Sequence, residues 1–273
     1  MSDDSSASPG TPLPAELDDA MPHSARVWNY LLGGKDHYPA DREVGDMILQ
    51  WSPEIARIAT VQRYFLARSV RFLASDRGIR QFLDIGTGLP THDNTHQVAQ
   101  RVAPECRIVY VDNDPLVLIF ARALLASTPE GACAYIDADV RDPDTILAEA
   151  AKTLDFSRPI ALTMLGIMGQ LPDSDNPEAI VRRLLDALPS GSYLALCDGT
   201  DTDDSLNQAI AAYNAKSASS YHLRSPERIA RFFDGLELVE PGVVTTSRWR
   251  PDFAEIEGEA QPVDAICGVA LKR

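Results

Sequence analysis

The chain contains little cysteine, and its cysteines stand too far apart to act together. The four of them, Cys106, Cys133, Cys197 and Cys267, form no C-x-x-C pair, so their spacing supports neither a zinc site nor a disulfide framework. All but Cys106 fall within apolar runs that are typical of strands. We therefore expect buried free thiols and no metal centre.

Basic residues are scarce relative to acidic ones. Lysine and arginine number 25 against 40 aspartates and glutamates, which gives a net charge of −15 at pH 7. A negative electrostatic field repels phosphates, which argues against a protein that binds nucleic acid or an anionic membrane by charge alone. A small molecule or a protein is the favoured partner, and a homodimer is left open.

Long hydrophobic runs are absent as well. No apolar run approaches the roughly 20 residues needed to span a bilayer. The N-terminal MSDDSSASPGTPLPAELDD has neither the basic nor the apolar region of a signal peptide, so we expect a soluble, cytoplasmic protein. A hydrophobic fraction of 45% still allows a sizeable core, and 273 residues fit one large domain, alone or with a smaller appendage.

The first third of the chain differs in pattern from the rest. Residues 1–20 are acidic and rich in serine and proline, which is typical of a disordered tail. Residues 21–78 predict three helices. We expect Ser24 to cap SARVWNYLLGG, Asp41 to cap DREVGDMILQW, and Ser52 to cap the long run EIARIATVQRYFLARSVRFLAS.

Residues 79–273 alternate short β-prone runs with helical stretches. The expected strands are QFLDI, RIVYVD, CAYIDA, IALTML, SYLALCD, LELVE and AICGVAL, and helix-like stretches separate the first five. This alternation predicts βαβ units and a mostly parallel sheet. The last two strands are separated by residues 241–264 and are expected to form a hairpin at the sheet edge.

A glycine turn follows the first expected strand, in QFLDIGTGLPT. Gly86 and Gly88 allow positive φ and let a ligand approach the backbone at the carboxyl end of the strand. A dinucleotide fingerprint requires a third glycine, where this chain has Thr91. Asp84, two residues before Gly86, would repel a pyrophosphate but suits a positively charged ligand. The turn therefore favours a cationic, adenosine-bearing ligand over NAD.

Two further acids follow the next strands. Asp112 ends RIVYVD, where a carboxylate can accept both hydroxyls of a ribose. Asp139, in CAYIDADVRD, is placed to receive the exocyclic amine of an adenine, with the Val140 N–H meeting a ring nitrogen. The alternative for both acids is a simple capping carboxylate, which is the role we expect of Asp114 and Asp142.

The order LDIGTG, VYVDND and DAD resembles motifs I, II and III of class I S-adenosylmethionine-dependent methyltransferases. The segments PHSARVWNYLLGGKDHYPADREVG and FLDIGTGLPTHDNTHQVAQ are similar, more specifically, to an actinobacterial family of methyltransferases long carried as a domain of unknown function. This resemblance covers nearly the whole chain from Met21 onward.

The resemblance implies a Rossmann-like α/β fold with a seven-stranded, mostly parallel sheet of order 3-2-1-4-5-7-6. Its last strand would be antiparallel, and residues 21–78 would form an N-terminal helical cap on a cofactor domain of residues 79–273. The cofactor would be S-adenosylmethionine, with S-adenosylhomocysteine as product. The resemblance implies that Asp84, Gly86 and Gly88 contact the amino-acid part of the cofactor. It implies that Asp112 contacts the ribose and that Asp139 and Val140 contact the adenine. Thr87 and Asn113 are further cofactor-binding candidates.

One segment departs from the family pattern. Relatives tend to carry a histidine and an aromatic residue before I-P-D, where LTMLGIMGQLPD has Gly169-Gln170-Leu171. This change predicts a difference in substrate or activity.

The N-terminal segment is dense in functional groups and predicts a lid over the cofactor. The alternative is a solvated helix end followed by an ordered loop. Arg26 or Lys35 is a candidate for the cofactor carboxylate, and Tyr30 or Tyr38 for facing the methyl group. The glycine pair Gly33-Gly34 would let the backbone pass near the ligand.

Methyl transfer needs a general base only when the nucleophile must lose a proton early. His37 is the first candidate for that base, with Tyr30 beside it. His92, His96 and His222 are weaker candidates. The segment with Arg248, Trp249 and Arg250 either lines an acceptor pocket or is a surface loop pinned by Trp249.

The leading hypothesis is thus a methyltransferase acting on a small molecule. A non-catalytic protein that senses or sequesters S-adenosylmethionine is the second hypothesis, and an NAD-dependent oxidoreductase is the third.

Overall fold

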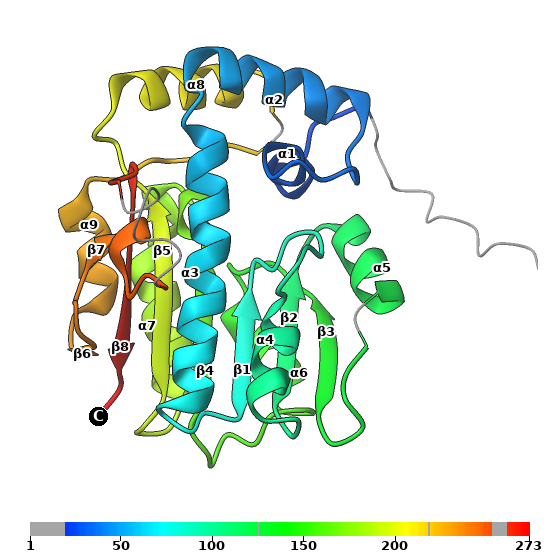
Figure 1. Ribbon diagram of the computed structural model, residues 1–273, viewed down its shortest axis with the longest axis vertical. Helices are drawn as coiled ribbons and strands as arrows, with labels where there is room; N and C mark the ends of the chain where they lie inside the picture. The colour runs from blue at the N-terminus through cyan, green and yellow to red at the C-terminus, as the bar shows by residue number, and fades with distance from the viewer. Residues whose placement is uncertain (1–19, 125, 218, 253–260) are drawn as a thin grey trace, which may run out of the picture.

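The computed structural model describes residues 20–124, 126–217, 219–252 and 261–273 (Figure 1). The expected acidic tail thus lies outside the described residues except for Ala20. The described chain forms an α/β fold, with one mixed sheet between helices and a helical layer above the carboxyl ends of the strands.

The sheet confirms the expected topology. Its strands are β1 (Gln81–Ile85), β2 (Arg107–Asp112), β3 (Ala132–Asp137), β4 (Ala161–Leu165), β5 (Tyr193–Gly199), β6 (Glu237–Leu238), β7 (Val244–Thr245) and β8 (Ala265–Leu271). The order is β3-β2-β1-β4-β5-β8-β6, with β1 to β5 parallel and β8 antiparallel to β5. LELVE and the residues after it supply two short strands, β6 and β7, which pair with opposite ends of β8.

The helices are α1 (Ser24–Leu31), α2 (Pro39–Trp51), α3 (Ile55–Ser75), α4 (Thr95–Val102), α5 (Pro115–Leu124), α6 (Pro143–Ala150), α7 (Pro177–Ala187), α8 (Asp204–Asn214) and α9 (Pro226–Ala230). Short 3-10 helices cover Met168–Gln170 (η1), Asp173–Asp175 (η2), Arg231–Phe233 (η3) and Thr246–Arg248 (η4). No helix in the described part of the chain is both long and apolar enough to cross a membrane.

The sheet is buried on both faces, which explains why its strands are nearly continuous apolar runs. Leu83 and Ile85 of β1 pack toward one face with α6, α7 and α9. Phe82 of the same strand packs toward the other face with α3 and α4.

Helix α3 joins the sheet to the helical layer above it. The side chains of its second half, such as Phe65 and Leu73, belong to the core against the sheet. Its first half, including Ile55 and Ile58, packs instead with α1, α2 and α8. Figure 1 shows this path, with α3 rising along the sheet to the three helices above it. We call α1, α2 and α8 the cap helices. Helix α8 was not predicted as part of the cap.

The predicted caps were wrong at the first three helices. His23, not Ser24, caps α1, because its Nδ1 accepts from the Ala25 N–H. Helix α2 begins two residues before Asp41, whose buried carboxylate accepts from the N–H of Tyr38 at 2.8 Å. Ser52 ends α2, since its N–H donates to Ile48 O at 2.8 Å.

The cysteines are free thiols. Cys106, Cys197 and Cys267 are buried as expected, whereas Cys133 on β3 is half-buried. Three of the four therefore confirm the prediction. The third strand begins and ends one residue earlier than predicted, because β3 covers Ala132–Asp137, so Asp139 lies two residues beyond its end.

Candidate functional site

A pocket lies at the carboxyl ends of β1, β4 and β5, beneath the cap helices. Its empty volume, with the open mouth included, is about 1380 Å³. The floor is formed by the turns after these strands, and the walls by α1, α3 and α8. This is where an open α/β sheet binds its ligand.

The glycine turn after β1 forms one end of the pocket. Gly86 and Gly88 have φ values of +71° and +65°, which L side chains rarely adopt. A Cβ on Gly86 would also lie 2.7 Å from Ile167 Cδ1, so the turn has no room for a side chain there. Thr87 lies between the two glycines and lines the pocket, with its hydroxyl donating to Asp84 O at 3.2 Å.

Asp84 lines the pocket but is almost entirely withdrawn from solvent. Its two carboxylate oxygens accept from the hydroxyls of Thr95 at 2.6 Å and Thr163 at 2.8 Å. Burial raises the pKa of Asp84, while these two hydroxyls and the positive charge of Arg63 oppose the rise. The turn is thus anchored on an acid that favours positive charge nearby.

Asp112 ends β2 beside the turn. Its Oδ2 accepts from the Gly88 N–H at 2.8 Å and its Oδ1 from the Asp114 N–H at 3.0 Å. A carboxylate has about four lone-pair sites, so two are left for hydroxyl donors in the pocket. Asp114 itself caps α5 through the Leu116 N–H, as expected.

The remaining motif residues lie next to Asp112 but outside the pocket lining. Asp139 Oδ2 accepts from Arg141 Nη1 at 2.9 Å and from Asn113 Nδ2 at 3.3 Å, and its Oδ1 accepts from the Arg141 N–H. Val140 is buried in the core beneath them. Asp142 caps α6 through the Thr145 N–H.

The structure turns most of the N-terminal candidates away from the pocket. Arg26 is buried and reaches Met21 O at 2.7 Å and Asp41 at 3.4 Å. The Tyr30 hydroxyl donates to Asp46 on α2, and the ring covers Gly45. Lys35 is exposed. None of these side chains lines the described pocket, whereas their neighbours Trp28 and Asn29 do.

The glycine pair and His37 belong to the same loop. A Cβ on Gly34 would lie 2.4 Å from Asn29 Oδ1, so the side chain of Asn29 would have to shift, and Gly33 has a φ of +75°. The ring of His37 meets Tyr30 edge-on at 5.0 Å. Tyr38 lies under the Arg26 guanidinium, 5.1 Å from its centre.

The other histidines are also placed outside the pocket lining. His96 is buried against Tyr110, with its Nδ1 2.9 Å from the phenol oxygen, and burial lowers its pKa. The backbone carbonyl of His92 accepts a hydrogen bond from Arg63 Nη2 at 3.1 Å. His222 hydrogen-bonds Gly169 O through its N–H. Among the described residues that line the pocket there is no histidine.

Two polar side chains of α3 were missed as site residues. Gln62 is only 4% exposed and lines the pocket, where it stands among apolar neighbours. Arg63 is the one cationic side chain among the described lining residues, and its buried Nε has no hydrogen-bond partner. Desolvation lowers the pKa of Arg63. The signal in the sequence was a polar residue, Gln62, on the 3-4 spacing of apolar residues such as Ile58 and Phe65, followed directly by Arg63.

The unusual Gly169-Gln170-Leu171 segment forms η1 and the turn after it. A Cβ on Gly169 would lie 2.2 Å from Tyr221 Cζ, so the ring of Tyr221 occupies the space of a side chain here. Gln170 and Tyr221 both line the pocket, while Leu171 is fully buried.

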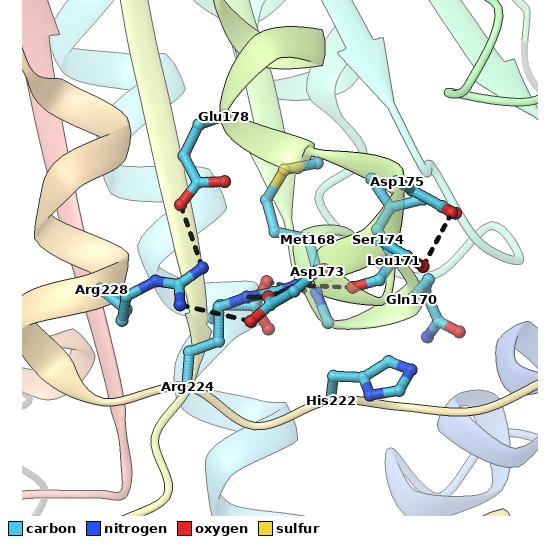
Figure 2. A network of polar contacts seen from close by, with 12 residues as sticks. Met168, Gln170, Leu171, Asp173, Ser174, Asp175, Glu178, His222, Arg224 and Arg228 are labelled. Atoms are coloured by element: carbon cyan, nitrogen blue, oxygen red, sulfur yellow. Dashed lines mark hydrogen bonds and ion pairs between the residues drawn. The ribbon is translucent and has the colours of Figure 1, made fainter.

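Arg224 fixes this segment from below. Its guanidinium donates to Met168 O at 2.7 Å and Leu171 O at 2.5 Å, and it pairs with Asp173 at 3.1 Å. Figure 2 shows Arg224 reaching into the turn, while Arg228 bridges Asp173 and Glu178. The loop that carries Tyr221 is therefore tied to the loop after β4.

The segment with Arg248, Trp249 and Arg250 is not part of the pocket lining. Trp249 is fully buried, with Phe65 and Phe72 edge-on to its ring at 5.4 and 5.8 Å. Arg250 lies over Phe72. Of the two interpretations of this segment, the structure favours a surface loop pinned by Trp249.

The charge of the pocket suits a cationic ligand. Its acids are Asp84, Asp112 and Asp264, against the single charge of Arg63. The described residues contain no group of three or more His, Cys, Asp or Glu side chains placed to hold a metal ion. The strand order and the glycine turn define a Rossmann-like fold of the methyltransferase class.

Comparisons with known proteins specify the family. Residues 10–273 match the model of the S-adenosyl methyltransferase family, so the chain belongs to that family and its cofactor is S-adenosylmethionine. No curated protein matches the sequence significantly.

Two solved structures resemble the chain closely. A DUF574 family protein from Streptomyces avermitilis is 46% identical, with a TM-score of 0.88 over 93% of this chain and 98% of that one. A protein from Thermobifida fusca that has been assigned as a methyltransferase is 41% identical, with a TM-score of 0.84 over 95% and 98%. A methyltransferase from Anabaena variabilis that depends on S-adenosylmethionine is 14% identical, covers 93% and 97%, and shares the fold with a TM-score of 0.53.

Proposed function

We propose that the protein transfers the methyl group of S-adenosylmethionine to a small-molecule acceptor. The observation that carries this proposal is one continuous pocket, which runs from the glycine turn after β1 to the end of β5. Strands of a sheet lie about 4.8 Å apart, so the pocket extends about 10 Å from β1 across β4 to β5. It has room for a cofactor at one end and an acceptor at the other.

The cofactor end is the β1 and β2 side. Asp112 would hold the ribose hydroxyls with the lone pairs that Gly88 and Asp114 leave free. Asp84 favours the ammonium of the amino-acid part, and the unpartnered Nε of Arg63 suits its carboxylate. In this proposal Arg63 takes the role first given to Arg26 or Lys35.

The adenine would lie beyond Asp112, along the ends of β2 and β3. Asn113, Asp139 and Val140 are gathered there, which supports the contacts that the sequence motifs imply. The side chain of Asp139 stays 37% exposed, so it can meet an amine despite its bonds to Arg141.

When bound, S-adenosylmethionine supplies a sulfonium whose methyl group is strongly electrophilic. The protein therefore has to position the acceptor and exclude water rather than supply a strong base. The cap helices do this with apolar side chains such as Trp28, Leu206 and Ile210, which line the pocket. Their cover over the strand ends, with α3 as a wall, supports the cap role proposed for residues 21–78 and adds α8 to it.

Isothermal titration with S-adenosylmethionine and S-adenosylhomocysteine tests the cofactor assignment. Transfer of a tritiated methyl group to the small-molecule fraction of a cell extract tests the reaction. Binding of both ligands with label in that fraction supports the proposal. Binding without any labelled product favours a sensor instead, and label found only in protein or nucleic acid contradicts a small acceptor.

A further inference from the structure

A buried acid and a tyrosine meet at the β5 end of the pocket. Asp198, near the end of β5, is 2% exposed, and its Oδ1 accepts from the Tyr221 hydroxyl. Tyr221 lines the pocket, and its Oη lies 3.8 Å from the Cβ position of Gly199, which lines it too. The proposed function assigns neither residue to the cofactor.

The hydrogen bonds around Asp198 fix the direction of this contact. Its carboxylate also accepts from the backbone N–H groups of Gly169 at 2.9 Å and Gly199 at 3.0 Å. Burial raises the pKa of Asp198, while these three donors and the positive charge of Arg224 oppose the rise. The Tyr221 hydroxyl donates its single proton to this carboxylate. The phenol oxygen is left to accept a hydrogen bond and cannot donate one into the pocket.

The position of Tyr221 is fixed on both sides. Its ring fills the space above Gly169, and the next residue, His222, donates its N–H to Gly169 O at 2.7 Å. Tyr221 N–H donates to Asn214 Oδ1 of α8 at 2.7 Å. Arg224 then ties the same loop to the turn after β4 (Figure 2). A group held this firmly is suited to orient a ligand.

The residues near Tyr221 indicate the polarity and charge of the rest of the ligand. Leu223, Leu206 and Ile58 belong with Tyr221 to the apolar cluster under the cap helices, and all of them line the pocket. Asp264, next to β8, lines the pocket too, and its carbonyl oxygen lies 3.9 Å from the Cβ position of Gly199. A carboxylate among the lining residues disfavours an anion.

We propose that Tyr221, oriented by Asp198, recognises the methyl acceptor, which is an apolar and uncharged molecule bearing one O–H or N–H donor. This inference rests on the proposed function, since it assigns the acceptor end of the same pocket. The phenol oxygen of Tyr221 would accept a hydrogen bond from the O–H or N–H group of the methyl acceptor. The lone pair of that oxygen or nitrogen can then face the methyl group of the cofactor. Tyr221 is thus a specificity-determining residue.

The test compares 2-naphthol with naphthalene, which has the same apolar shape without the hydroxyl. Affinities are measured by equilibrium dialysis on protein saturated with S-adenosylhomocysteine, for the wild type, Tyr221→Phe and Tyr64→Phe. Tyr221→Phe keeps the ring above Gly169 and removes only the hydroxyl. Tyr64 is 40% exposed on α3 and outside the described lining, so its variant is the matched control.

We expect Tyr221→Phe to lower the preference for 2-naphthol over naphthalene by about fivefold, the usual value of one hydrogen bond. Naphthalene binding and S-adenosylhomocysteine binding should not change, and Tyr64→Phe should behave as the wild type. An unchanged preference in Tyr221→Phe overturns the role of Tyr221. Failure of both ligands to bind, while S-adenosylhomocysteine binds, overturns the acceptor class alone. Failure of S-adenosylhomocysteine itself overturns the proposed function and this inference with it.

Discussion

Replacing Asp112 by alanine removes the acid that we assign to the ribose. In the structure its carboxylate also accepts from two backbone N–H groups, those of Gly88 and Asp114. The variant should lose charge-assisted hydrogen bonds to the ligand, worth about 1.5–3 kcal/mol. We therefore expect affinity for S-adenosylhomocysteine to fall roughly 10- to 150-fold in isothermal titration.

Part of any loss could come from a loosened turn rather than from the ribose contact. Asp114→Ala is the control, because Asp114 also accepts from a backbone N–H, caps α5, and pairs with His23 at 2.9 Å, yet lies outside the described pocket lining. It should cost about 0.5–2 kcal/mol of stability and leave the affinity near that of the wild type. Equal affinities of the Asp112→Ala protein and the wild type would refute the ribose assignment. Equal losses in the two variants would show that the effect is structural.

Three further predictions follow from the site and its supports. Arg63→Met should weaken S-adenosylhomocysteine binding roughly tenfold but leave 5′-methylthioadenosine, which lacks the amino-acid part, unaffected in the same titration; equal losses for both ligands would contradict the carboxylate role. Burial raises the pKa of Asp84, so the folded state holds its proton more tightly and stability falls as pH rises above about 4. In urea unfolding, Asp84→Asn should thus have a higher free energy of unfolding than the wild type at pH 7, with a smaller gain at pH 4.5. A gain that does not depend on pH would contradict the raised pKa of Asp84. Trp249→Phe should cost about 1–3 kcal/mol in the same unfolding assay, with unchanged affinity for S-adenosylhomocysteine, and a loss of affinity would return this residue to the pocket.

The sequence predicted the sheet well because its signals are local. Apolar runs bounded by turns predicted the bounds of β1, β2 and β8 as the structure has them. The glycine turn was predicted to bind a ligand, and Gly86 lies where a Cβ would strike Ile167. Asp112 was predicted from its place at the end of a strand, and it lines the pocket.

The acceptor side could not be predicted in the same way, because it depends on contacts between distant segments. Tyr221 meets Gly169 and Asp198 across 52 and 23 positions of the chain, and no local pattern links them. The departure at Gly169 was noticed, but only the fold shows that a ring from another loop fills the space. Arg26 was predicted because its segment is dense in polar residues, whereas Arg63 was missed. The contact of Arg26 with Asp41 is a tertiary one that no local pattern reveals.

A structure with S-adenosylhomocysteine bound tests the central claim most directly. We expect the ribose hydroxyls within hydrogen-bond distance of Asp112 and the amino-acid part between Asp84 and Arg63. The sulfur should face the acceptor end of the pocket, where Tyr221 lies. A ligand bound elsewhere, or with its ribose away from Asp112, would contradict it.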